Sequence, residues 1–150
     1  MNASAREAAC ESRWPLILCI DDDPQITEAI RIRLRPYELD VVCAHHGMHG
    51  FWLAMTERPD LVVTDLRMPQ GPGNYVVQCL RNNTDTREIP VIILTGQRGP
   101  ELSRQLFGLN VDAVLTKPVL FEELLAEIAK HVSLRERDEQ ETMATTASLQ

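Results

Sequence analysis

The sequence predicts an α/β fold: a doubly wound, five-stranded parallel sheet flanked by five helices. Five apolar runs of four to six residues recur along the 150-residue chain, and each is rich in β-branched residues or leucine, as in strands buried on both faces. Each segment between them is long enough for one helix, and such alternation favours right-handed crossovers. The predicted strands are Leu16–Ile20, Leu39–Ala44, Leu61–Thr64, Pro90–Leu94 and Ala113–Thr116.

The helix boundaries are marked by capping residues and prolines. Asp23 is a suitable cap for the first helix, since a proline follows it at a position that needs no backbone donor. Pro36 ends that helix. Pro100 begins the fourth helix, and Asn110 stands where we expect it to end, because asparagine tolerates the left-handed conformation. The apolar stripe of the last helix is Phe121, Leu124, Leu125, Ile128 and Ala129.

The length favours one domain, which we place at residues 14–132. The polar residues 1–13 are expected to form a flexible extension. Residues 133–150 turn charged and then rich in Thr, Ala and Ser, so we expect the last helix to continue to about Arg137 and a flexible tail to follow.

The charge balance excludes one class of partner. The chain has 15 Lys and Arg against 22 Asp and Glu, a formal net charge of −7. Nucleic acids are bound mainly through Lys and Arg, so a direct nucleic-acid partner is not expected. No apolar run approaches the roughly 18 residues of a membrane span, and no secretory signal is recognisable. We therefore expect a cytoplasmic protein without a membrane partner.

Neither the cysteines nor the histidines favour a metal site. The four cysteines lack a C-x-x-C spacing, and Cys19 and Cys43 lie in apolar runs, so we expect buried reduced thiols. A small cluster that could ligate a metal is formed by His45, His46 and His49. We expect its loop to lie far from the site described next, which favours exposed or partly packed histidines. Trp52 and Met55 have helical spacing, which favours packing in the core or at an interface.

Polar residues collect at the carboxyl ends of the predicted strands. In open α/β sheets these ends form the binding site. Closely packed carboxylates repel one another, and with only oxygen ligands a bound Mg²⁺ or Mn²⁺ is expected to relieve the repulsion. A metal beside an ammonium and a hydroxyl suits a phosphoryl group. The residues are Asp21–Asp23 after the first strand, Asp65 after the third, Thr95 after the fourth and Lys117 after the fifth.

These motifs resemble the receiver domain of two-component response regulators, a CheY-like, flavodoxin-like fold with strand order 2-1-3-4-5. The resemblance covers residues 14–132, with every element in order. It rests on an apolar strand followed by acids (Ile20-Asp21-Asp22-Asp23-Pro24), on Asp65-Leu66-Arg67-Met68-Pro69 with Gly73, on Thr95, and on Lys117-Pro118.

The resemblance implies a phosphoprotein in phosphorelay signal transduction. Asp65 would accept a phosphoryl group from a histidine kinase or a histidine phosphotransfer protein. The implied Mg²⁺ ligands are Asp22, Asp65 and the backbone carbonyl of Arg67, with Asp21 acting directly or through water. The implied phosphoryl ligands are Thr95, Lys117 and the backbone N–H groups of Leu66 and Gly96. Asp23 is expected to cap the first helix instead of binding metal.

The sequence departs from the family pattern at Val114 and in the loop after Asp65, which has Pro72 where the family often has an acidic residue just before the glycine. Val114 stands three residues before the lysine, where the family usually has a Tyr or Phe that moves with the hydroxyl residue. Either signalling uses another surface, or the domain relays or stores phosphoryl groups.

Arg67 and Gln97 occupy positions that resemble those governing phosphoryl lifetime in the family.

We therefore expect a stand-alone receiver that acts on an unknown downstream protein or by onward phosphotransfer. It would catalyse only its own phosphorylation and dephosphorylation. The sequence leaves open whether the protein forms a homodimer. One alternative is a haloacid-dehalogenase-like phosphatase with an Asp nucleophile. Those enzymes carry a second aspartate two residues later, where this chain has Arg67, and usually a cap domain. Another alternative is a receiver that binds partners without phosphorylation, which the intact acidic set argues against.

Overall fold

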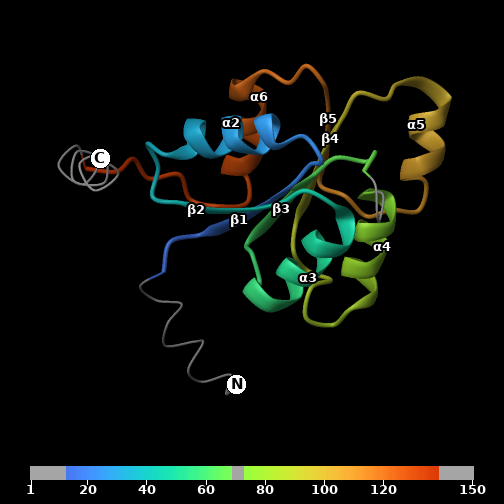
Figure 1. Ribbon diagram of the computed structural model, residues 1–150, viewed down its shortest axis with the longest axis horizontal. Coiled ribbons are helices and arrows are strands. Elements are labelled where there is room, and N and C mark those ends of the chain that lie inside the picture. The colour runs from blue at the N-terminus through green and yellow to red at the C-terminus, as the bar shows by residue number, and fades with distance from the viewer. Residues whose placement is uncertain (1–12, 69–72, 139–150) are drawn as a thin grey trace.

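The computed structural model describes residues 13–68 and 73–138 and confirms the predicted fold. Five parallel strands form one sheet in the order β2-β1-β3-β4-β5 (Figure 1). The strands are β1 (Leu16–Ile20), β2 (Asp40–Ala44), β3 (Leu61–Thr64), β4 (Val91–Thr95) and β5 (Ala113–Thr116). Three strands agree with the prediction residue for residue. β2 begins one residue later than predicted, and β4 both begins and ends one residue later.

Helices cover both faces of this sheet, as a doubly wound topology requires. In Figure 1, α2 and α6 lie above the sheet and α3 and α4 below it, with α5 toward one end. The helices are α2 (Pro24–Leu34), α3 (Gly47–Glu57), α4 (Gly73–Asn82), α5 (Gly99–Leu106) and α6 (Phe121–Ala129).

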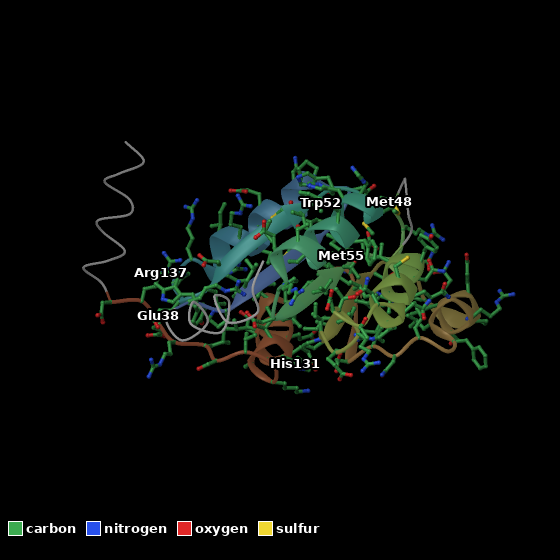
Figure 2. All side chains as sticks on the ribbon, turned by 90° about the horizontal axis from the view of Figure 1, so that it is seen from below. Glu38, Met48, Trp52, Met55, His131 and Arg137 are labelled. Atoms are coloured by element: carbon green, nitrogen blue, oxygen red, sulfur yellow. The ribbon has the colours of Figure 1, made fainter. Side chains whose placement is uncertain are left out.

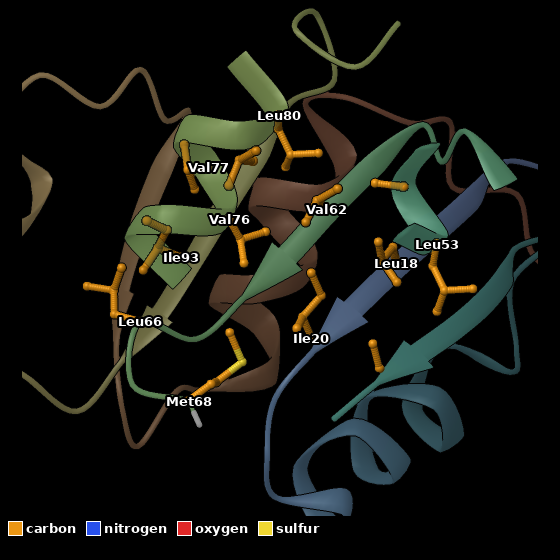
Figure 3. Packing of buried hydrophobic residues seen from close by; sticks show 13 residues of the cluster. Leu18, Ile20, Leu53, Val62, Leu66, Met68, Val76, Val77, Leu80 and Ile93 are labelled. Carbon is orange, nitrogen blue, oxygen red and sulfur yellow. The ribbon is translucent and has the colours of Figure 1, made fainter. Parts of the chain in front are cut away.

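The core consists of two apolar clusters, one on each face of the sheet. Successive strand residues point to opposite faces, so Leu18 and Ile20 join one cluster while Ile17 and Cys19 join the other. Figure 3 shows the first cluster, in which strand residues pack against α3 and α4. Full burial of one such aliphatic side chain stabilises the fold by about 1.5–3 kcal/mol. The two clusters fix the positions of the strand ends.

Local capping rules hold at α2 and fail at the end of α5. Asp23 accepts a hydrogen bond from the backbone N–H of Gln25 (2.9 Å), which confirms it as the cap. The prediction that α5 ends at Asn110 is wrong: the helix ends at Leu106. Gly108 has the left-handed conformation instead, with φ of 76°, because a residue without Cβ adopts it without steric cost.

The predicted extension of the last helix to about Arg137 is also wrong. α6 ends at Ala129, and the chain then turns back toward the loop before β2. The backbone N–H of Glu38 donates to the carbonyl of Arg135, and that of Arg137 donates to the carbonyl of Pro36, both at 2.7 Å. Figure 2 shows Glu38 and Arg137 at the same end of the molecule. These distant contacts satisfy backbone groups that a longer helix would have satisfied internally.

Other predictions fall on exposed or undescribed residues. Trp52 and Met55 are 58% and 38% exposed on the outer side of α3, so packing into the core is excluded (Figure 2). The expected flexibility of the two ends falls largely on residues 1–12 and 139–150, outside the described residues. Within the described ranges, no helix is long and apolar enough to cross a membrane.

Candidate functional site

Four polar residues meet at the carboxyl edge of the sheet. Asp21 and Asp65 directly follow the neighbouring strands β1 and β3, and the N–H of Asp65 donates to the carbonyl of Ile20 (3.0 Å). Thr95 ends β4 and is fully buried. Lys117 directly follows β5, and its N–H donates to the carbonyl of Thr95 (2.8 Å). The sheet order thus brings together residues that are far apart in sequence.

Lys117 is the central cation of this site. Its Nζ donates to Oδ2 of Asp21 at 2.9 Å and to Oδ2 of Asp65 at 3.0 Å. Both carboxylates are buried, whereas the Lys117 side chain is 24% exposed. Desolvation alone would lower the pKa of Lys117, but the hydrogen bonds and charges of Asp21 and Asp65 outweigh it and raise that pKa above its usual value. The lysine therefore stays charged.

The carboxylates form an acidic triad that suits a divalent cation. Asp21, Asp22 and Asp65 each place a carboxylate oxygen within 4.8 Å of the others, and Asp22 is exposed. Among the residues with a described placement, no other group of three His, Cys, Asp or Glu side chains has this geometry. A hard oxygen donor set that is open to solvent on one side fits Mg²⁺, which keeps several waters when bound. The residues present therefore fit the metal.

Backbone groups hold the Asp65 carboxylate in place. Its Oδ1 accepts from the N–H of Leu66 (2.6 Å) and from that of Arg67 (3.3 Å). Gly73, the first residue of α4, lies against the Asp65 backbone: a Cβ on Gly73 would stand 2.8 Å from the Asp65 carbonyl carbon. A Cβ on Gly96 would meet no atom within 4 Å, so the site is open there. A side chain at position 73 is incompatible with this position of Asp65.

A comparison with protein families decides the classification. The model of the response regulator receiver domain matches residues 17–129, which is more than half of the chain. The chain belongs to this family. The match lies inside the predicted domain of residues 14–132 and carries the acidic triad and Lys117. Receiver domains are signalling modules that interact with histidine kinases.

Relatives and solved structures agree with this membership. The receiver domain is 40% identical over 114 residues to the DNA-binding dual master transcriptional regulator RpaA of Synechocystis, covering 76% of this chain and 47% of that protein. It is 33% identical over 135 residues to the response regulator MprA of Mycobacterium avium, covering 88% and 58%. The chain thus spans about half the length of these relatives.

Two solved structures share the fold. The receiver domain of Francisella response regulator 1452 aligns with a TM-score of 0.69 at 29% identity, covering 77% of this chain and 93% of that one. The chemotaxis protein CheY4 of Vibrio cholerae aligns with a TM-score of 0.72 at 24% identity, covering 79% and 99%, and shows the fold alone.

Arg67 and Gln97, in the loops after β3 and β4, contact each other through polar groups. With its amide oxygen turned toward Arg67, Gln97 accepts from Nη2 of Arg67 (2.8 Å) and from Nε, while its nitrogen donates to Gln105. The guanidinium of Arg67 also lies 3.8 Å from Glu101 on α5. Val114 on β5 is half-buried and packs against the apolar core cluster that lies between the sheet and helices α3 and α4. The polar contacts of Arg67 and Gln97 link the loop after Asp65 to α5.

The histidine cluster is closer to the site than its place in the sequence indicated. Nδ1 of His45 lies 3.2 Å from the backbone carbonyl of Asp21, so the expectation that this loop is remote is wrong. The reason is that β2 lies beside β1 and their ends coincide. His46 caps α3 by accepting from the N–H of His49 (3.2 Å). A backbone contact and a helix cap therefore account for two of these histidines.

Proposed function

We propose that this receiver domain accepts a phosphoryl group on Asp65 from a phosphohistidine of a histidine kinase or a histidine phosphotransfer protein. The observation that carries the proposal is the position of the Lys117 ammonium, 2.9 Å from Asp21 and 3.0 Å from Asp65. It counters the charge of two buried carboxylates, one of which must approach an anionic phosphoryl group.

The proposed metal ligands are the three carboxylates Asp21, Asp22 and Asp65, together with the backbone carbonyl of Arg67. Their mutual proximity and the exposure of Asp22 support this assignment. When bound there, Mg²⁺ neutralises charge on the oxygens of the transferring group. Mn²⁺ prefers the same oxygen ligands and would replace it.

The proposed transfer is an attack by the Asp65 carboxylate on phosphorus. A P–O bond forms, the P–N bond to the donor histidine breaks, and its electron pair leaves with the imidazole. The carboxylate is oriented by the backbone N–H groups bonded to its Oδ1. Phosphoryl oxygens would be received by Lys117, the Thr95 hydroxyl and the N–H group of Gly96, beside the open space at Gly96. The N–H of Leu66, which bonds to Oδ1 of Asp65 before transfer, would turn to a phosphoryl oxygen afterwards.

The phosphorylated domain would signal by contact with a downstream protein or pass the group onward. Because Val114 offers no aromatic ring, the polar contacts of Arg67 and Gln97 are the proposed link between the phosphoryl site and α5. DNA binding is a property of the Synechocystis relative as a whole, and we assign none to this domain.

The test is incubation with Mg²⁺ and acetyl phosphate, followed by intact mass measurement. We expect one phosphoryl adduct that depends on Mg²⁺, is lost on base treatment and is absent in Asp65→Asn. Asp60→Asn is the matched control, because Asp60 precedes β3 and bonds to Leu16 at the opposite end of the strands. No adduct with any small donor would support partner binding without phosphorylation, and rapid turnover of phosphomonoesters would support a phosphatase.

A further inference from the structure

Two cysteines lie side by side in the sheet. Cys19 of β1 and Cys43 of β2 are register partners in neighbouring parallel strands. Cys19 belongs to the apolar cluster between the sheet and helices α2 and α6, and Cys43 packs against the same cluster. Their side chains therefore point to the same face of the sheet. Neighbouring strands are about 4.8 Å apart, and a disulfide needs Cα atoms roughly 4.4–6.8 Å apart. The backbone thus places the two thiols within range of a disulfide bond.

The two thiols differ in access to solvent. Cys43 is half-buried on the edge strand β2 and lines an open cavity of about 590 Å³ between α2 and β2. Cys19 is 1% exposed, on a strand flanked by β2 and β3. A small oxidant therefore meets Cys43 first.

Arg31 provides a cation at the accessible sulfur. Its Nη2 lies 3.3 Å from Sγ of Cys43, and Arg31, on α2, lines the same cavity. Nε of Arg31 is buried and has no hydrogen-bond partner. A guanidinium beside a sulfur stabilises negative charge on it during attack, and the unpaired Nε can donate to an oxygen added to that sulfur.

We propose that Cys19 and Cys43 are a redox pair that a peroxide converts into a reversible disulfide between β1 and β2. The Cys43 sulfur attacks the peroxide, the O–O bond breaks, and Cys43 sulfenic acid and water (or an alcohol) form. Cys19 then attacks the Cys43 sulfur, the S–O bond breaks, and the hydroxyl leaves with the Cys19 proton as water. The two sulfurs together lose two electrons, and the peroxide gains them.

The experiment uses the full chain with Cys10→Ser, which leaves the three cysteines that the structure describes. The protein is treated with hydrogen peroxide, unfolded, alkylated with N-ethylmaleimide, and analysed by intact mass and peptide mapping. We expect a link between the β1 and β2 peptides to form roughly tenfold faster than Cys79 on α4 is oxidised, and dithiothreitol to reverse it. If peroxide has oxidised Cys79 but N-ethylmaleimide still alkylates both Cys19 and Cys43, the proposal is overturned.

Variants test the order of the two steps. In Cys19→Ser, dimedone should capture Cys43 as its sulfenic acid. In Cys43→Ser, Cys19 should stay reduced, and its oxidation there would contradict the order of steps. Arg31→Gln should slow the link several-fold, whereas Arg33→Gln, on the same helix beside Phe121, should not. Equal rates in these two variants would remove Arg31 from the proposal, and the measurement on the Cys10→Ser protein stands if a variant fails to fold.

Discussion

The ammonium of Lys117 lies 3.0 Å from Oδ2 of Asp65, although the two residues are 52 positions apart in the chain. The same ammonium bonds to Asp21, so one cation serves two buried carboxylates. Breaking such an arrangement leaves buried charge unpaired, which costs more than loss of a surface ion pair.

Replacement of Lys117 by Met should slow phosphorylation of Asp65 by roughly 100-fold, because a preorganised positive charge at the reacting oxygens is lost. The rate of adduct formation from acetyl phosphate measures this. Lys130→Met is the matched control, since Lys130 is the other lysine of the sequence and its Nζ bonds to Glu127 on the surface of α6. Equal rates in the two variants would show that Lys117 does not assist transfer.

Mg²⁺ should stabilise the folded protein through the acidic triad. At a Mg²⁺ concentration 100 times its dissociation constant, the free energy of unfolding should rise by about 2.7 kcal/mol. Thermal unfolding with increasing Mg²⁺ measures the effect, which Asp22→Asn should greatly weaken. Asp23→Asn should keep it, because asparagine caps a helix as well as aspartate does and Asp23 serves α2. Equal loss in both variants would contradict the ligand assignment.

Gly73→Ala should destabilise the fold and impair phosphorylation together. Its Cβ would stand 2.9 Å from Cα of Leu66 and too close to the Asp65 carbonyl group, and both contacts are with backbone. Overpacking of this kind costs about 1–3 kcal/mol. Gly96→Ala should change the free energy of unfolding much less, since nothing lies near its Cβ. Urea unfolding of the two variants compares them, and an unaffected Gly73→Ala protein would refute the prediction.

Arg67→Ala should shorten the lifetime of the phosphorylated form several-fold. The Arg67 side chain contacts Gln97 and Glu101. Because Arg67 is two residues from Asp65, we expect its side chain, held by these contacts, to hinder or orient the attacking water. The decay of the adduct after removal of the phosphodonor measures the lifetime. Arg104→Ala, an exposed change on α5, serves as the control. A decay unchanged from wild type would exclude Arg67 from control of lifetime.

Stability should fall at alkaline pH through Cys19. Burial, followed by the neighbouring Cys43, raises the pKa of the Cys19 thiol above its ordinary value of 9.0. Above pH 9 the unfolded chain releases this proton while the folded state keeps it, so the free energy of unfolding falls as pH rises. With reductant present, urea unfolding at pH 7 and pH 10 should show a larger loss for wild type than for Cys19→Ala. Equal losses would contradict the linkage.

Local rules account for most of the elements. Strand boundaries follow from short apolar runs, and the start of α2 follows from Asp23 and Pro24, because these signals act within a few residues. These local rules fail at the ends of α5 and α6. Gly108 ends the turn after α5, and Arg135 finds its backbone partner at Glu38, in a loop distant in sequence.

The sequence alone determined the fold class and the chemical identity of the site, because apolar periodicity and the residues after each strand are local properties. Only the tertiary structure decided that Lys117 bonds both Asp21 and Asp65, and that Cys19 faces Cys43 beside Arg31. These relationships depend on strand order and register. Packing of both sheet faces sets that order and register, and no short stretch of sequence is enough to specify the strand order or the register.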